Sequence, residues 1–381
     1  MRLSIRIATL LLLVLPAIAA AQATRIDTIY TPPGYPGGAL RGTIFIPETS
    51  KGAGVVLLHG GGGSRSDLYT WCDSLAANGY VAMAISYPDL SVPNSNYPLP
   101  VRAFKTGVEF LRANASRFGI TTNKIMGLGI SYGALVLGQA IAADNRDDII
   151  GTDPAIDDAV QGAVLLYGTY NMRRWMGANY DWFVQNFYGG DTALARAGNT
   201  IENLDRITAP VLLAHGTADD VYESNQSQEL NDSLIRRGKQ SQIALFADQG
   251  HMFDFDFHDG GFSQAGLGVK QLAVTFLNSL VAGASVDAPG TGMVGNLACR
   301  VVPNPASSQA SVSFCLRQPG NVTVEVIDLL GREVMRQETG ALDAGCRDHA
   351  IRLDGIPAGA YYCRVRAGNE MGLVPVVIRE N

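Results

Sequence analysis

The sequence has little charge for its 381 residues and no excess of basic residues. Charged residues make up 17%, with 29 lysines and arginines against 35 acidic residues, and no basic stripe could neutralise a run of phosphates. This balance excludes nucleic acid as an expected partner. No C-x-x-C spacing points to zinc, and no lysine-containing phosphate loop points to a nucleotide. The G-x-G-x-x-G spacing at residues 290–295 does not lie between a strand pattern and a helix pattern, so we expect neither a metal nor a cofactor.

Long apolar runs are also scarce, and the longest candidate lies at the N-terminus. Residues 1–23 carry Arg2 and Arg6, an apolar run from Ile7 to Leu15, and then a small-residue tail with A-x-A sites. The run is shorter than the roughly 20 residues that a membrane-spanning helix needs. Residues 1–23 therefore predict a secretory signal peptide, with a membrane anchor as the competing interpretation.

Cysteine is rare, and its five positions are unevenly spread. Cys72 stands alone, whereas Cys299, Cys315, Cys346 and Cys363 all lie near the C-terminus. An exported chain permits disulfides there. Four cysteines allow three pairings that the sequence leaves open, and some of them could be small buried apolar residues instead.

The 47% of hydrophobic residues suffice for a sizeable core, and their pattern changes once along the chain. Over residues 24–283, short apolar runs alternate with helical patterns, which predicts an α/β fold with a mostly parallel sheet flanked by helices. Gly79 and Gly238 stand where helices should end. The expected strands are residues 40–46, 54–58, 81–86, 124–130, 162–166, 211–215 and 242–246, and the expected helices are residues 66–78, 100–118, 132–143 and 224–238.

Residues 284–298 contain a stretch of small residues, glycine and proline without a period, which predicts a linker. Beyond it, residues 299–381 contain short alternating runs separated by turns, which predict a small antiparallel β-sandwich. The expected strands of this part are residues 310–316, 322–328, 350–353, 361–366 and 373–378.

The strongest chemical signal is a G-x-S-x-G motif that follows an apolar strand pattern and precedes a helical one. The motif places Ser131 on a sharp turn between Gly129 and Gly133, where neighbours without side chains relieve crowding. Ser131 then stands at a helix N-terminus, where the helix dipole stabilises an oxyanion. The sequence therefore predicts Ser131 to be a nucleophile.

A serine nucleophile needs a base and an acid that orients the base. His251 is the expected base because it follows a late apolar strand and comes after the acid in the chain, with His258 as its rival. Asp219 and Asp220 both follow the strand that ends at His215, and only one of them can face the histidine. We expect Asp219 to be the acid.

The HGGGG loop at residues 59–63 directly follows an apolar strand and is expected to supply half of an oxyanion hole. The backbone N–H of Gly61 is the first choice of donor and that of Gly60 the second, while the N–H of Tyr132 supplies the other donor. His59 is expected to shape the loop rather than transfer protons.

Residues 170–188 are unusually aromatic, with Trp175, Trp182 and Phe183 among them. Such side chains could form the wall of an acyl or aromatic pocket, or they could pack a cap helix onto the body of the protein. The pattern leaves both interpretations open.

The HGGGG loop, the stretch from Val101 to Gly133 and the HGTADD…GH ending together resemble the α/β-hydrolase superfamily over roughly residues 30–280. The resemblance is close to dienelactone hydrolase-like and acetyl-xylan or feruloyl esterase-like proteins, and it implies that Asp219 is the triad acid. Dienelactone hydrolases proper usually carry cysteine where this chain has Ser131. HGTADD also occurs in prolyl-oligopeptidase-like peptidases, but no propeller repeats are present here.

The C-terminal segment carries PNP, DLLGREV and GAYYCRV, and these pieces resemble the sorting domain of type IX secretion substrates. This resemblance implies export across the outer membrane and an encounter with the secretion machinery. A carbohydrate-binding module is the alternative.

Taken together, these expectations describe a secreted or surface-located serine esterase. Its substrate would be a small-molecule or polysaccharide-linked carboxylic ester. A peptidase or amidase, and a non-catalytic surface binding protein that keeps the fold, are the alternatives.

Overall fold

A computed structural model describes residues 23–36, 38–89, 97–121, 124–143, 149, 151–256, 261–282, 297, 299–303, 306–316, 318–327, 333–357, 359–368 and 370–379. The predicted signal peptide lies outside these residues except for Ala23. The predicted linker lies outside them except for Leu297. No helix among the described residues combines the length and the apolar character that crossing a membrane requires.

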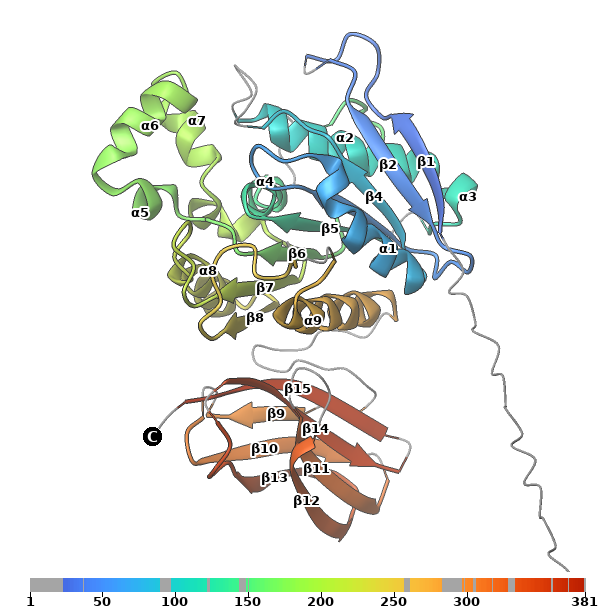
Figure 1. The fold of residues 1–381 in the computed structure, drawn as a ribbon, viewed down its shortest axis with the longest axis vertical. Coiled ribbons are helices and arrows are strands. Elements are labelled where there is room, and N and C mark those ends of the chain that lie inside the picture. The colour runs from blue at the N-terminus through green and yellow to red at the C-terminus, as the bar shows by residue number, and fades with distance from the viewer. Residues whose placement is uncertain are drawn as a thin grey trace, which may run out of the picture.

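An eight-stranded sheet forms the centre of residues 24–282, in the order β1-β2-β4-β3-β5-β6-β7-β8 (Figure 1). Neighbouring strands run parallel from β4 to β8, while β1 and β2 are antiparallel additions at one edge. The predicted α/β class with a mostly parallel sheet is confirmed. The strands are β1 (Thr24–Ile29), β2 (Arg41–Ile46), β3 (Gly54–Leu58), β4 (Val81–Ile85), β5 (Ile125–Ile130), β6 (Ala163–Leu166), β7 (Val211–Gly216) and β8 (Ser241–Phe246).

Helices cover both faces of this sheet, which explains why β3, β4, β5 and β7 are buried at every residue. On one face, α2 (Leu99–Ala113), α4 (Tyr132–Ile141) and α8 (Asn225–Arg236) share an apolar cluster with the sheet. On the other face, α1 (Tyr69–Ala77), which follows the short helix η1 (Arg65–Leu68), packs with α9 (Gln264–Val281). The core is therefore two apolar layers separated by the sheet.

Several elements differ from the sequence prediction. The expected helix over residues 100–118 ends at Asn114, whose amide donates to the Phe110 carbonyl at 2.8 Å, and the short helix α3 (Ala115–Phe118) follows it. The strand β1 and the helix α9 were not predicted. Gly79 and Gly238 do follow helix ends, with φ values of 85° and 66° that favour glycine.

A cap of short helices is inserted between β6 and β7 and forms a separate lobe beside α4 (Figure 1). The sequence prediction placed no defined helix in this segment. The cap helices are α5 (Met172–Met176), η2 (Gly177–Asn179), α6 (Tyr180–Phe187), α7 (Thr192–Ala197), η3 (Thr200–Glu202) and η4 (Leu204–Arg206).

The C-terminal residues form two antiparallel sheets with a shared apolar core. Cys315 and Cys346 are paired across adjacent strands, while Cys299 and Cys363 are free and buried. Ile327 and Tyr362 join the apolar cluster on the α9 side of the large sheet. The strands are β9 (Cys299–Val302), β10 (Gln309–Leu316), β11 (Gly320–Ile327), β12 (Glu333–Leu342), β13 (Gly345–Arg352), β14 (Gly359–Ala367) and β15 (Glu370–Ile378). Of these, β9 and β12 were not predicted.

Candidate active site

Ser131 occupies the sharp turn between β5 and α4 in a strained backbone conformation. Its φ of 53° and ψ of −120° are rare for a residue with a side chain. A Cβ at Gly133 would lie 2.4 Å from the Leu58 carbonyl oxygen, and a Cβ at Gly129 would lie 2.4 Å from that of Gly133. The expectation that both flanking positions need glycine is confirmed by these close approaches.

His251 lies on the loop after β8, and its ring joins Ser131 to an acid. The Ser131 Oγ is 2.8 Å from Nε2 of the imidazole, and Nδ1 is 2.8 Å from Oδ2 of Asp219. Because a carboxylate accepts, Nδ1 carries a proton, and Nε2 of a neutral ring then accepts from the serine hydroxyl. Three side chains from three different strand ends therefore form one continuous hydrogen-bonded chain.

Asp219 is held at four points by donors. Its Oδ1 accepts from the backbone N–H groups of Val221 and Tyr222, each at 2.9 Å, and its Oδ2 also lies 3.1 Å from Nε2 of the buried His215. Burial alone would raise the pKa of Asp219, but the hydrogen bonds from His215, His251 and Tyr222 outweigh it and hold the pKa well below its usual range. Asp219 therefore stays ionised at every pH at which the protein would work.

The other candidate residues lie elsewhere. Asp220 is exposed beside Asp219 and directs no described bond toward His251. His59 is buried, its Nδ1 lies 2.7 Å from the Gly60 carbonyl, and burial lowers the pKa of its ring. These contacts agree with a role in shaping the loop. The rival base, His258, lies outside the described residues.

The glycine loop after β3 passes directly over the serine turn. A Cβ at Gly60 would lie 3.5 Å from the Ser131 Cβ, and a Cβ at Gly61 would lie 3.4 Å from the Tyr132 Cβ. The loop is fixed from the segment after β4, because Tyr87 donates to the His59 carbonyl at 2.5 Å. Sequence reasoning missed this support, since the segment carries no motif.

A second support of the glycine loop comes from the same segment. The buried Asp89 accepts from the Gly62 N–H at 2.6 Å, which is short enough for a charge-assisted bond. The first N–H groups of α4, including that of Tyr132, have no partner within the helix. Gly61 and Tyr132 thus lie together beside Ser131, as the sequence predicts.

An apolar cavity of about 200 Å³ adjoins the serine turn on the cap side. Tyr132, the residue after Ser131, forms part of its wall, and α5 and α6 contribute most of the remainder. Trp175 and Phe183 contact each other edge-on with ring centroids 6.0 Å apart. Both interpretations of the aromatic segment therefore apply, because the same side chains pack the cap and line the cavity. The lining residues are Tyr97, Tyr132, Leu135, Gln139, Met172, Trp175, Met176, Trp182, Phe183, Phe187 and Tyr188.

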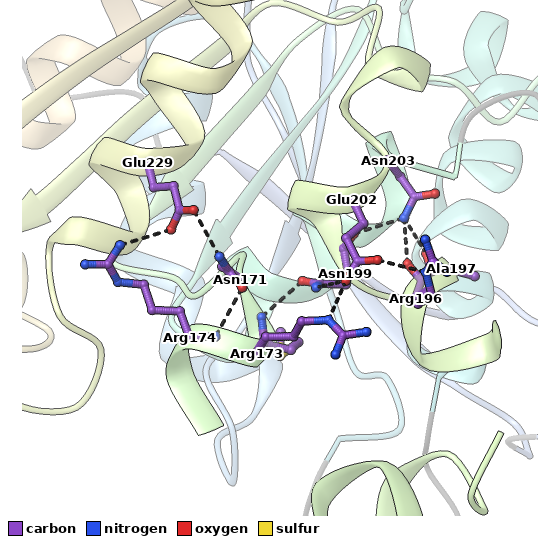
Figure 2. A network of polar contacts seen from close by, with 10 residues as sticks. Asn171, Arg173, Arg174, Arg196, Ala197, Asn199, Glu202, Asn203 and Glu229 are labelled. Atoms are coloured by element: carbon purple, nitrogen blue, oxygen red, sulfur yellow. Dashed lines mark hydrogen bonds and ion pairs between the residues drawn. The ribbon is translucent and has the colours of Figure 1, made fainter. Parts of the chain in front are cut away.

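Polar contacts fasten the cap to the body and to itself (Figure 2). Glu202 accepts from Arg173 on α5 and from Arg196 on α7, each at 3.0 Å, so it joins two cap helices. Asn171 caps α5 through its side chain and donates to Glu229 on α8 at 3.0 Å. The walls of the cavity are thus held in place from outside by ion pairs and amides.

Residues 43–234 match the BD-FAE family model, which covers half of the chain, and this range includes Ser131 and Asp219. The chain belongs to the BD-FAE family. This is an esterase-type α/β-hydrolase family. Residues 300–379 match the secretion system C-terminal sorting domain. That domain indicates type IX secretion, so the protein is exported, and it implies an interaction with the secretion machinery.

Two proteins similar to this BD-FAE protein are esterases. This chain is 27% identical to Esterase LipC of Mycobacterium tuberculosis over 225 residues, and the match covers 55% of this chain. The chain spans 55% of the length of that relative. The propionate-bound structure of esterase Est2 from Thermogutta terrifontis matches with a TM-score of 0.57 and 20% identity, over 71% of this chain and 97% of that chain. The same enzyme phosphorylated by paraoxon matches with a TM-score of 0.56 and 20% identity, over 70% of this chain and 96% of that chain. These likenesses between structures establish the fold.

No cluster of histidine, cysteine or acidic side chains among the described residues could hold a metal ion.

The close approach at Gly133 leads to a stability prediction. In Gly133→Ala, the new methyl group meets the Leu58 carbonyl at 2.4 Å and that of His59 at 2.6 Å, and neither backbone group can rotate away. We expect a loss of about 1–3 kcal/mol in the free energy of unfolding, measured by urea denaturation. Gly320→Ala is the control, because a Cβ there meets nothing within 4 Å. Equal stability of the two variants would contradict this account of the turn.

Proposed function

We propose that the protein hydrolyses carboxylic esters through an acyl-enzyme formed on Ser131. The observation that carries the proposal is the hydrogen-bonded chain from the Ser131 Oγ through His251 to Asp219, with both links at 2.8 Å. A serine hydroxyl is a weak nucleophile by itself, and such a chain is the arrangement that activates it. The esterase family of the chain and its esterase relatives support the same reaction.

In the proposed reaction, Ser131 attacks the ester carbonyl while His251 accepts the serine proton at Nε2. The ionised Asp219 keeps the ring in the required tautomer and stabilises the imidazolium. The N–H groups of Gly61 and Tyr132 donate to the oxyanion that develops on the carbonyl oxygen. His251 then protonates the leaving alcohol, and water repeats the sequence to release the acid.

We further propose that the apolar cavity beside Tyr132 holds an apolar group of the ester. Its walls are mostly aromatic and methionine side chains, which favour an aliphatic or aromatic group over a charged one. The ester could be free or attached to a polysaccharide at the cell surface. The family and the sorting domain are compatible with both.

Substitutions in the proposed triad test the mechanism. We expect Ser131→Ala and His251→Ala each to lower kcat by roughly 10⁶, because triad members act as a unit. Asp219→Asn should lower kcat on the order of 10⁴ by favouring the wrong tautomer. Rates are measured on a p-nitrophenyl ester, and circular dichroism checks folding.

Asp220→Asn is the matched control for the acid, because this exposed neighbour should tolerate the change. A greater loss in Asp220→Asn than in Asp219→Asn would show that the acid is misassigned. Fluorophosphonate labelling of the wild type at Ser131 tests activation of the serine, since an unactivated serine does not react. Faster cleavage of an anilide than of the matching ester would make the protein an amidase or peptidase.

The cavity gives a specificity prediction. Met176→Trp places a larger side chain in the cavity wall at the end of α5, where Met176 is only partly buried. We expect kcat/KM for p-nitrophenyl esters with long or aromatic acyl groups to fall at least tenfold. Such a fall is on the order of what the loss of one apolar contact in a pocket causes. The p-nitrophenyl acetate rate serves as the internal control and should stay within twofold. Equal losses on both esters would exclude this cavity as the acyl site.

We also propose the division into a catalytic domain at 24–283, a linker at 284–298 and a sorting domain at 299–381. Every proposed catalytic residue precedes the linker, and the described contacts of the sandwich with the α9 side involve Ile327 and Tyr362. Truncation near Gly290 should therefore leave kcat on a soluble ester unchanged but abolish delivery to the surface or medium of the native host.

Activity and localisation of the full-length and truncated chains are compared. Loss of activity on the soluble ester would show that the catalytic part depends on the sandwich, through a shared site or through the contacts of Ile327 and Tyr362. Normal delivery with weaker binding to an insoluble polysaccharide would identify the C-terminal part as a carbohydrate-binding module.

A further inference from the structure

A second buried carboxylate lies three residues after His251 and has no part in the scheme above. Asp254 has no exposed surface. Its Oδ1 accepts from the Tyr167 hydroxyl at 2.7 Å, and its Oδ2 accepts from the Trp71 indole N–H at 2.9 Å. Both donors are neutral, and no lysine or arginine acts on Asp254 in the described part of the chain.

A buried carboxylate without a cation is unfavourable unless its charge is compensated. Burial raises the pKa of Asp254 to about 6, although the hydrogen bonds from Tyr167 and Trp71 oppose the shift. A neutral acceptor would bridge the same two donors at less cost. The presence of a carboxylate in place of a neutral acceptor therefore points to a role for its negative charge. Asp254 carries that charge above about pH 6.

The geometry connects this charge to the imidazole of His251. The Tyr167 ring, whose hydroxyl holds Asp254, contacts the His251 ring edge-on with centroids 5.0 Å apart. A positive charge on His251 favours the ionised form of Asp254. The Asp254 carboxylate and the His251 imidazole are thus separated by one aromatic ring, that of Tyr167.

The loop that carries both residues is fixed against the rest of the fold. The Asp254 carbonyl accepts from the Ser263 N–H at 3.0 Å, and a Cβ at Gly266 would lie 2.0 Å from that carbonyl oxygen. Trp71 holds the carboxylate from α1, and Tyr167 holds it from the end of β6. The loop is thus attached on three sides close to His251.

Resting on the proposed function, we propose that Asp254 is a positioning residue that fixes the loop of His251 and supplies a second negative charge in favour of its imidazolium. The titratable groups that face it are Tyr167 after β6 and His251 on its own loop, while Trp71 on α1 and the start of α9 contribute no charge. The charge of Asp219 also acts on Tyr167. At pH values above the acid limb the imidazolium forms only during acyl transfer, so the charge lowers the barrier there rather than strengthening substrate binding.

The first test is Asp254→Asn, which keeps the size of the side chain and removes its charge. We expect kcat on a p-nitrophenyl ester to fall about tenfold with KM within twofold. We also expect the acid limb of kcat/KM against pH to move by about half a pH unit or more toward lower pH, because the imidazolium is less favoured. A residue that only fixed the loop would leave the acid limb in place.

The second test is Tyr167→Phe, which keeps the ring against His251 and the carboxylate in place. Loss of the hydroxyl removes a hydrogen bond that lowers the pKa of Asp254, so Asp254 stays protonated to higher pH. Activity near pH 7 should therefore fall severalfold and return to within twofold of the wild type as the pH approaches 9. This variant decides the matter if Asp254→Asn fails to fold, as judged by thermal melting.

Glu109→Gln is the matched control, because Glu109 is a buried carboxylate on α2 that binds the Thr152 and Asp153 N–H groups. It should keep the wild-type acid limb. An unmoved acid limb in Asp254→Asn, or a loss in Tyr167→Phe that is the same at every pH, overturns the role of Asp254 while the Ser131 mechanism stands. Absence of Ser131-dependent hydrolysis in the wild type overturns both proposals.

Discussion

The arrangement of the site depends on the contact between the first turn of α4 and the end of β3. At Gly133 the helix lies so close to the Leu58 and His59 carbonyls that no Cβ fits. This contact forces the chain to turn sharply at Ser131 and leaves its φ at 53°. It also brings the glycine loop after β3 over the serine turn. One steric constraint therefore sets the direction of the serine and the position of the N–H groups beside it.

The two buried acids near His251 are stabilised in opposite ways. Asp219 receives two backbone N–H bonds and two imidazole contacts, and these hold its pKa well below the usual range. Asp254 receives two neutral donors, and its pKa is raised to about 6. The larger number of donors to Asp219 and the complete burial of Asp254 thus separate the two acids. Asp219 is a permanent charge, whereas the charge of Asp254 depends on pH.

Much of the fold could be predicted because its signals are local. Buried strands appear as short apolar runs, and Gly79 and Gly238 mark helix ends through their positive φ. The motif around Ser131 and the strand ends before Asp219 and His251 sufficed to predict that these side chains lie together, and the structure places them within hydrogen-bond distance. Their catalytic roles stay predictions.

Other features were missed because they depend on contacts that are distant in the sequence. Asp254 is 183 residues from Trp71 and 87 residues from Tyr167 in the sequence, and no motif near Asp254 indicates either partner. The edge strand β1 alternates exposed and partly buried residues and therefore lacks the apolar run of a central strand. Asn114 interrupts the long helix by bonding back to Phe110, which the helical periodicity does not reveal.

Because the cap is inserted between β6 and β7, the residues that line the cavity and the reactive residues lie in different segments of the chain. Ser131, Asp219 and His251 follow strands of the sheet, whereas most of the cavity wall comes from the inserted α5 and α6. Both ends of the insertion return to neighbouring parallel strands, so its length and content do not affect strand order. A protein built in this way can diverge in what it accepts while the sheet that carries its reactive groups is inherited intact. Selection can therefore act on the cap as a module of its own.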